Sequence, residues 1–240
     1  MDELDEINVS AVDKVVEFFK SRLRVQGRTP CIYIVCVGAS VATEHLPAPL
    51  SQYLAGDLSG GQFPSGVYLP EYQAALLQFG CRTRISNVVY HELAHALLIL
   101  LTGGFRFALA IEEGYAGFIE HGFLNGNRRL APAQGYWKPD DLLTVKELLQ
   151  NCTWKKAEDP EGHRKRTFLS YWLNVYLSRI SEQRREMRTR LRTLWMKQLR
   201  NPQDVYAWLL EASAMSAEEF EDGFATFCTT GRHPLASQPP

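Results

Sequence analysis

The stretch ISNVVYHELAHALLILL, residues Ile85 to Leu101, includes the longest apolar run of the chain. Placed on a helix, it is apolar on nearly every side, which is typical of a helix buried in the middle of a domain. The glycine pair Gly103-Gly104 comes shortly after and is expected to end the helix. The run is too short to cross a bilayer and contains ionisable side chains, so it predicts a core helix and no membrane span.

Upstream of this helix the pattern predicts two strands. CIYIVCV, residues Cys31 to Val37, is a continuous β-rich run and is interpreted as a buried strand. GVYL, residues Gly66 to Leu69, is a second strand candidate, which Pro70 would end. Residues 38–64, between the two, are rich in Gly, Ser, Ala and Pro and are predicted to be mainly loop. A segment that begins at Ser10 has helical spacing and precedes the first strand.

Downstream, almost every segment has helical spacing or a capping signal. Thr144 with Glu147 and Ser216 with Glu219 are predicted capping boxes, in which the first and fourth residues satisfy each other's backbone N–H groups. Further helices are predicted at Ile111 to His121, Arg166 to Ile180, Glu182 to Arg200 and Val205 to Leu210.

Together these patterns predict an α+β fold class, with a small N-terminal α/β part and a short sheet followed by a mainly helical part. Residues 1–230 are expected to form a single domain, with an α/β lobe of about residues 1–102 and a helical lobe of about residues 103–230. The tail, residues 231–240, contains three prolines and little to bury, and is predicted to be disordered.

Composition narrows the choice of partners and compartment. Of the 240 residues, 45% are hydrophobic, which is enough to bury a sizeable core. A net charge of -1 argues against nucleic acid or an anionic membrane as a partner. The acidic start, MDELDE, lacks the features of a signal peptide. The five cysteines are scattered and odd in number, which suits reduced thiols, so a cytoplasmic location is expected. The oligomeric state stays open.

Within the buried helix, HELAH at residues His91 to His95 has the H-E-x-x-H pattern. Residues four apart lie on one face of a helix, so both imidazoles can reach one metal ion. Glu92 would project beside the ion, where a general base takes a proton from water. A catalytic zinc ion has three protein ligands and an open position, so a third ligand is expected from a separate element.

Glu113, in the segment IEEGYA, is the candidate third ligand, with seventeen residues between it and His95. The intervening segment is long enough to reverse the chain and lay a second helix antiparallel to the first. The small residues Gly114 and Ala116 would allow a close approach. Buried without partners, the two histidines and the glutamate of the HELAH helix would each cost about 1–3 kcal/mol, a cost that a metal ion removes. One Zn2+ per chain is therefore predicted.

These two motifs, HELAH and Glu113-Gly114-Tyr115-Ala116, resemble those of gluzincin metallopeptidases, with the H-E-x-x-H and E-G-x-A pattern of aminopeptidase-N-like enzymes and of peptidase-MA-like domains. The resemblance covers roughly Gly60 to Phe227, but only the two motifs are specific. It implies a zincin-like fold, zinc-dependent hydrolysis of peptide bonds, and a peptide or protein substrate that adds as a strand beside Gly66 to Leu69. It leaves open whether cleavage is internal or terminal.

The resemblance also implies further site residues. Glu120, two turns after Glu113, matches an acid that orients a ligand imidazole; a solvent-facing glutamate is the alternative. The usual donor to the oxyanion, a tyrosine, falls on Phe168, which has no donor group. Tyr171, one turn on, is the expected substitute, with His163 and Arg166 as further candidates.

The departure at Phe168 keeps a second function open. The chain would then be a catalytically weak or inactive zinc-binding module with a regulatory or protein-interaction role. An intact Glu92 and a set of three ligands favour the enzyme, because structural zinc sites usually have four protein ligands.

Overall fold

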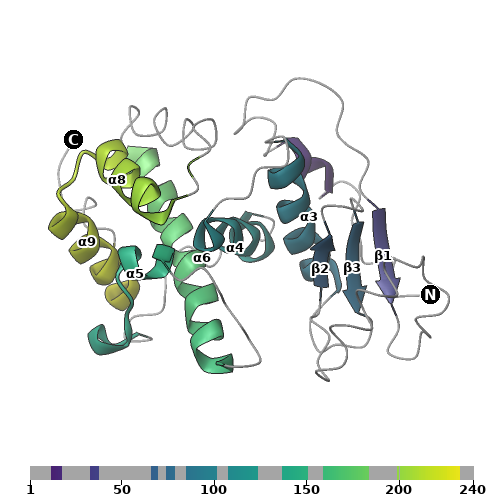
Figure 1. Cartoon of the computed structure of the whole chain (residues 1–240), viewed down its shortest axis with the longest axis horizontal. Helices are drawn as coiled ribbons and strands as arrows, with labels where there is room; N and C mark the ends of the chain where they lie inside the picture. Colours follow the sequence, from purple (N-terminus) through teal and green to yellow (C-terminus); the bar gives the residue numbers. More distant parts are fainter. Residues whose placement is uncertain are drawn as a thin grey trace.

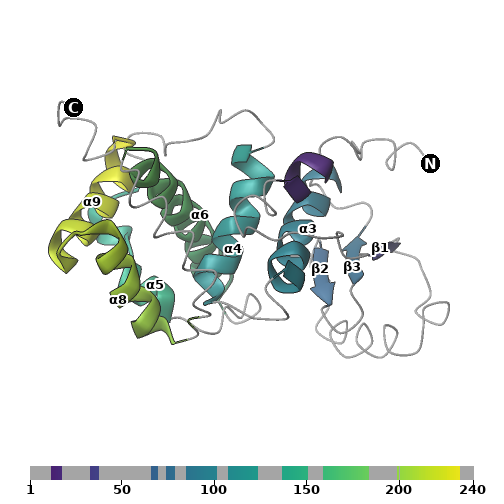
Figure 2. The ribbon, with the colours of Figure 1, turned by 90° about the horizontal axis from the view of Figure 1, so that it is seen from above.

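In the computed structural model the elements follow one another across the molecule, from a small sheet through helices α3, α4 and α6 to α5, α8 and α9 (Figures 1 and 2). The structure describes residues 12–17, 33–37, 66–69, 74–78, 85–101, 108–123, 137–150, 159–183, 199 and 201–232.

Three short strands form the sheet, in the order β1-β3-β2. β1 (Tyr33–Val37) is parallel to β3 (Ala74–Gln78), and β2 (Gly66–Leu69) is antiparallel to β3, with Tyr68 opposite Ala75. β2 is therefore an edge of this sheet. The strand predictions at β1 and β2 are confirmed. β3 was not predicted, because its sequence AALLQ has little of the β-branched and aromatic content typical of strands.

α3 covers Ile85–Leu101, as the apolar run predicts. α4 (Leu109–Phe118) continues without a break into a π-helix, η4 (Ile119–Phe123). A short 3-10 helix, η5 (Pro139–Asp141), precedes α5 (Val145–Gln150). Three longer helices follow: α6 (Pro160–Gln183), α8 (Pro202–Ser213) and α9 (Ala217–Thr230). Residues 12–17, near the start of the chain, form a further helical segment.

The prediction of an α+β class is wrong, because the described part of the chain is mainly helical. The strands hold 5, 4 and 5 residues, whereas α6 alone holds 24. The main buried cluster joins side chains of α3, α4, α5, α6, α8 and α9. Of the strand side chains that the structure describes, Tyr68 and Ala75 are buried, in a small separate cluster with Ala96 and Ile99 of α3. Through these two side chains the sheet packs against α3.

Both predicted capping boxes are present. The Ser216 hydroxyl accepts from the backbone N–H of Glu219, whose carboxylate accepts from the backbone N–H of Ser216. Thr144 and Glu147 make the same pair of bonds before α5. α6 begins at Pro160, six residues before the predicted start, because the Asp159 carboxylate accepts from the backbone N–H of Gly162 and caps an earlier turn.

Some expectations fall outside the described residues. They concern the loop at 38–64, most of the helix expected at Glu182 to Arg200, and the disordered tail beyond residue 232. Of the five cysteines, Cys228 is described as free and buried. None of the described helices has both the length and the apolar character needed to cross a membrane. The predicted domain boundaries stay a prediction.

The helical part is held together at the start of α5 by Glu221 of α9. Its carboxylate oxygens accept from the backbone N–H groups of Val145 at 2.7 Å and Lys146 at 3.2 Å. The first N–H groups of a helix have no partner within the helix and carry a partial positive charge, so a carboxylate stabilises them. Burial, together with a hydrogen bond to Glu221, raises the pKa of Tyr206 in α8 to about 12. One carboxylate therefore joins α5, α8 and α9.

We expect Glu221→Gln to lower the free energy of unfolding by about 1–2 kcal/mol, because the charge that stabilises the α5 start is lost. Urea unfolding of the purified protein measures this change. Asp222→Asn is the matched control, since Asp222 is the next residue of α9 and is exposed. Equal losses in the two variants would contradict the role of Glu221.

Candidate metal centre

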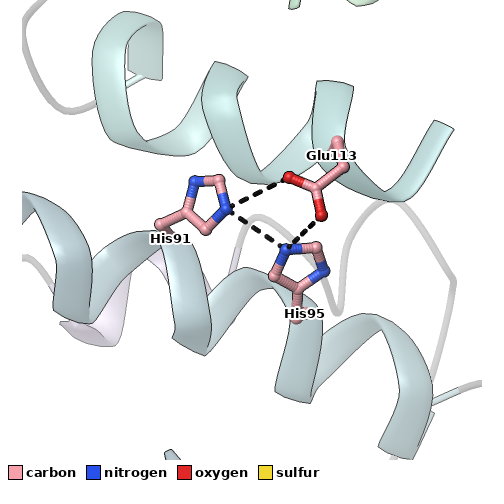
Figure 3. A group of neighbouring side chains, drawn as sticks. All are labelled: His91, His95 and Glu113. Atoms are coloured by element: carbon pink, nitrogen blue, oxygen red, sulfur yellow. Dashed lines mark hydrogen bonds and ion pairs between the residues drawn. The ribbon is translucent and has the colours of Figure 1, made fainter. Parts of the chain in front are cut away.

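Two histidines of α3 and one glutamate of α4 point at one another between the two helices (Figure 3). His91 and His95 are four residues apart, so both rings leave the same face of α3. Glu113 faces them from α4. The side chains of His91, His95 and Glu113 are 18%, 11% and 22% exposed, so the cluster is largely covered. Within the described residues, these are the ones whose ligand atoms gather closely enough to hold a metal ion.

The two imidazole nitrogens and the Glu113 carboxylate gather closely enough to hold one metal ion. His91 Nε2 lies 3.2 Å from His95 Nε2 and 3.5 Å from Glu113 Oε2, and His95 Nε2 lies 3.6 Å from Glu113 Oε1. Ligand atoms at about 2.1 Å from a tetrahedral zinc ion lie about 3.4 Å from one another. An octahedral ion at the same bond length would place neighbouring ligands at about 3.0 Å. The nitrogen and oxygen donors and their spacing are therefore compatible with a bound metal ion, and its identity as zinc stays a prediction.

Glu120 fixes the orientation of the His91 ring. Its Oε2 lies 3.0 Å from His91 Nδ1. Since an ionised carboxylate only accepts hydrogen bonds, His91 Nδ1–H is the donor, and Nε2 is left facing Glu113 and His95. Metal-binding histidines commonly donate their second N–H in this way. The structure thus brings Glu120 beside a candidate ligand, as predicted from sequence, and its effect on metal binding stays a prediction.

The charges of the cluster support one another in the metal-free chain. Burial lowers the pKa of His91, but hydrogen bonds to Glu113 and Glu120 outweigh burial and hold this pKa well above 6.5. Burial acts to raise the pKa of Glu113, yet His95 and His91 bring it down to about 2. His91 is therefore protonated and Glu113 is ionised near neutral pH. A divalent cation would take the place of the His91 proton.

Glu92, the predicted general base, is 6% exposed and follows His91 on α3. Burial raises the pKa of its carboxyl to about 7, and the charges of Glu113 and Glu120 add to the rise. The charge of His91 and a hydrogen bond from the backbone N–H of Tyr68 oppose it. A pKa near the working pH suits a group that must both take and give a proton.

α4 can hold Glu113 in place because it lies very close to α6. A Cβ atom on Gly114 would overlap Asn174 Nδ2 and the carbonyl oxygen of Ser170, so this position has no room for a side chain. Asn174 is itself held, because its Nδ2 donates to the Ser170 carbonyl oxygen at 3.1 Å. Gly114 was predicted to allow a close approach of α4 to α3, but the structure shows its tight contact with α6, so the prediction is wrong about which helix Gly114 meets.

Tyr171, the predicted oxyanion donor, lies in α6 and is 4% exposed. Its ring packs edge-on against His121, with centroids 5.9 Å apart and an interplanar angle of 81°. Its Cβ would lie 3.4 Å from a Cβ placed on Gly117 of α4. These contacts place Tyr171 where α6 meets the α4–η4 junction. Its role as a donor stays a prediction.

The other donor candidates occupy the first turns of α6. The charge of His163 contributes to the low pKa of Glu113, so His163 lies within electrostatic reach of the cluster. Arg166 pairs with Asp159 at 3.3 Å. Phe168 is covered by the guanidinium of Arg164, which lies 5.9 Å from the centroid of its ring. The structure therefore gives Phe168 a packing role.

Sequence reasoning missed two contributors to this site. One is the backbone of Tyr68 on β2, which has no side-chain signal. The other is His121, whose Nε2 lies 3.5 Å from Glu120 Oε2. The distance in sequence from His121 to either motif matches no known ligand pattern. Only its position next to Glu120 could have drawn attention to it.

Comparison of the chain with protein families, with curated proteins and with solved structures gave no match. The interpretation of the site therefore depends on its own geometry.

We expect Gly114→Ala to destabilise the protein by about 1–3 kcal/mol, because the added methyl group meets the α6 backbone. The same shift would displace Glu113, so zinc retention should fall as well. Gly117→Ala is the control. Its Cβ finds ordinary contact distances and gains up to about 1 kcal/mol of helix propensity. Urea unfolding and zinc content measure both effects, and equal behaviour of the two variants would contradict this account.

Zinc retention should fall as pH is lowered from about 8 to about 5, because protons compete for the His91 nitrogen. The sign follows from the raised pKa of His91, which is protonated below that pKa, whereas Glu113 stays ionised down to about pH 2. Equilibrium dialysis against buffered zinc at several pH values measures this. Retention that is constant across the range would contradict the assignment of His91.

Proposed function

We propose that this chain is a zinc metallopeptidase of the gluzincin type, which hydrolyses peptide bonds with Glu92 as general base. The observation that carries the proposal is the gathering of the His91 and His95 nitrogens and the Glu113 carboxylate, with a buried acid of pKa about 7 beside them. His91, His95 and Glu113 would hold the ion. Three protein ligands leave a position open for chemistry, whereas structural zinc sites usually have four.

A bound zinc ion would supply a Lewis acid that polarises a carbonyl group and lowers the pKa of water to about 7. The residues of the chain supply the rest. Glu92 takes a proton from the attacking water and passes it to the leaving amine. Glu120 keeps the His91 ring in the orientation that directs Nε2 at the site.

The edge strand β2 supports a peptide as substrate. β2 is at one side of the sheet, and its Tyr68 backbone N–H bonds to Glu92. An extended peptide that adds to this edge by main-chain hydrogen bonds would lie beside the general base. Such binding uses the main chain of the substrate and not its side chains. The expected substrate is therefore a peptide or protein of no particular sequence.

The donor to the oxyanion is the open element of the mechanism. Removal of such a donor typically lowers kcat by about 10²–10³. Tyr171 stays the first candidate, with His163 and Arg166 as alternatives. A zinc-binding module without hydrolytic activity is the second candidate function. It is favoured by Phe168, which has no donor and packs under Arg164.

We propose a cytoplasmic location from the scattered cysteines, and no nucleic-acid or membrane partner from the net charge of -1.

Glu92→Gln keeps the shape of the side chain but removes the base, so zinc should stay bound while hydrolysis falls by orders of magnitude. The measurement is zinc content together with cleavage of a peptide library, read by mass spectrometry with and without chelator. His91→Ala is the control for the metal, since it should lose both zinc and activity. Wild-type activity in Glu92→Gln would contradict the mechanism. Zinc binding without any cleavage by the wild-type chain would favour the inactive module.

A further inference from the structure

His121 lies at the outer end of a line of contacts that leads to the candidate metal ligands. Its Nε2 is 3.5 Å from Glu120 Oε2, and the same oxygen accepts from His91 Nδ1 at 3.0 Å. The side chains become less exposed toward Glu120: His121 is 34% exposed and Glu120 is 13% exposed. One carboxylate oxygen therefore lies between an outer histidine and a candidate ligand histidine.

The π-helix η4 makes this arrangement possible. Glu120 and His121 both lie in η4, which begins directly after α4. A π-helix has a wider turn than an α-helix, so consecutive side chains diverge less around the axis. Glu120 keeps the face that α4 gives to Glu113, while His121 can still reach the same carboxylate. Such segments are frequent at functional sites.

The Glu120 carboxylate lies near two other acidic side chains. The Glu113 and Glu120 carboxylates both act on Glu92 as like charges, so three acids crowd this side of the site. His121 Nε2 on the outer side and His91 Nδ1 on the inner side both lie close to the same carboxylate oxygen, at 3.5 Å and 3.0 Å, and hold it between them.

We propose that His121 is a positioning residue, which holds the Glu120 carboxylate against His91 and thereby strengthens metal binding. The inference rests on the metal-binding part of the proposed function and not on peptide hydrolysis. It predicts an effect that passes through Glu120. An effect of packing would instead pass through Tyr171, whose ring contacts that of His121.

Two substitutions separate these routes. His121→Phe keeps an aromatic ring against Tyr171 but removes the nitrogen that faces Glu120. His121→Gln loses the ring but keeps an N–H donor at a similar reach. Zinc affinity, measured by competition with a chelator, should be about three- to tenfold weaker in His121→Phe and near the wild-type value in His121→Gln. This loss is smaller than the about 10–100-fold expected for Glu120→Gln, which contacts the ligand itself.

The double variant Glu120→Gln/His121→Phe decides the route. If His121 acts through Glu120, the double variant binds zinc as weakly as Glu120→Gln alone. Separate, multiplying losses would overturn the proposal, as would wild-type affinity in His121→Phe. A loss in His121→Gln with none in His121→Phe would assign His121 to packing. Urea unfolding of the metal-free variants checks that the fold is kept.

These outcomes are distinct from failure of the proposed function. If the wild-type chain binds no zinc, both the metal site and this inference are wrong. If zinc binds and Glu120→Gln weakens it while His121→Phe does not, the inference alone is wrong. If His121→Phe weakens zinc binding through Glu120 but the chain cleaves no peptide, the inference stands and peptide hydrolysis does not.

Discussion

The structure depends on the burial of three ionisable side chains, His91, Glu92 and His95, in a helix whose other described side chains are apolar. A charge in such surroundings is costly unless it is paired. The partners come from outside α3: carboxylates from α4 and η4, and a backbone N–H from β2. The positions of α4, η4 and β2 are therefore fixed by their contacts with His91, Glu92 and His95 of α3. A shift of any of them would leave a buried charge without its partner.

α4 supplies one of these partners, the Glu113 carboxylate. It lies between α3 and α6, as both views show (Figures 1 and 2). Glu113 faces α3, while the next residue, Gly114, faces α6 with no room for a side chain. The helix thus carries a carboxylate on one side and small residues on the other. Close packing on the α6 side limits how far α4 can move, and so fixes the distance between the Glu113 carboxylate and the two imidazoles. Rigid support of this kind is what a metal site requires.

Local signals in the sequence predicted the local features well. The apolar run gave α3, the capping boxes gave the starts of α5 and α9, and the four-residue spacing put both histidines on one face. The start of α6 was missed because the residues from His163 to Arg166 are polar and show no apolar helical spacing. The Asp159 cap, which marks the true start, was not recognised in the sequence. The fold class was wrong because strand patterns indicate that strands exist and not how much of the core they form. Such quantities depend on packing between distant segments.

If the chain binds a metal ion as proposed, the ion and the Glu92 carboxyl would influence each other. In the metal-free chain, burial and two nearby carboxylates hold its pKa at about 7, so near neutral pH it is partly protonated. A divalent cation between His91, His95 and Glu113 would neutralise the charge of Glu113 and favour the ionised form of Glu92. The same event removes the proton from His91. In the proposed mechanism, metal binding would therefore increase the ionised fraction of Glu92.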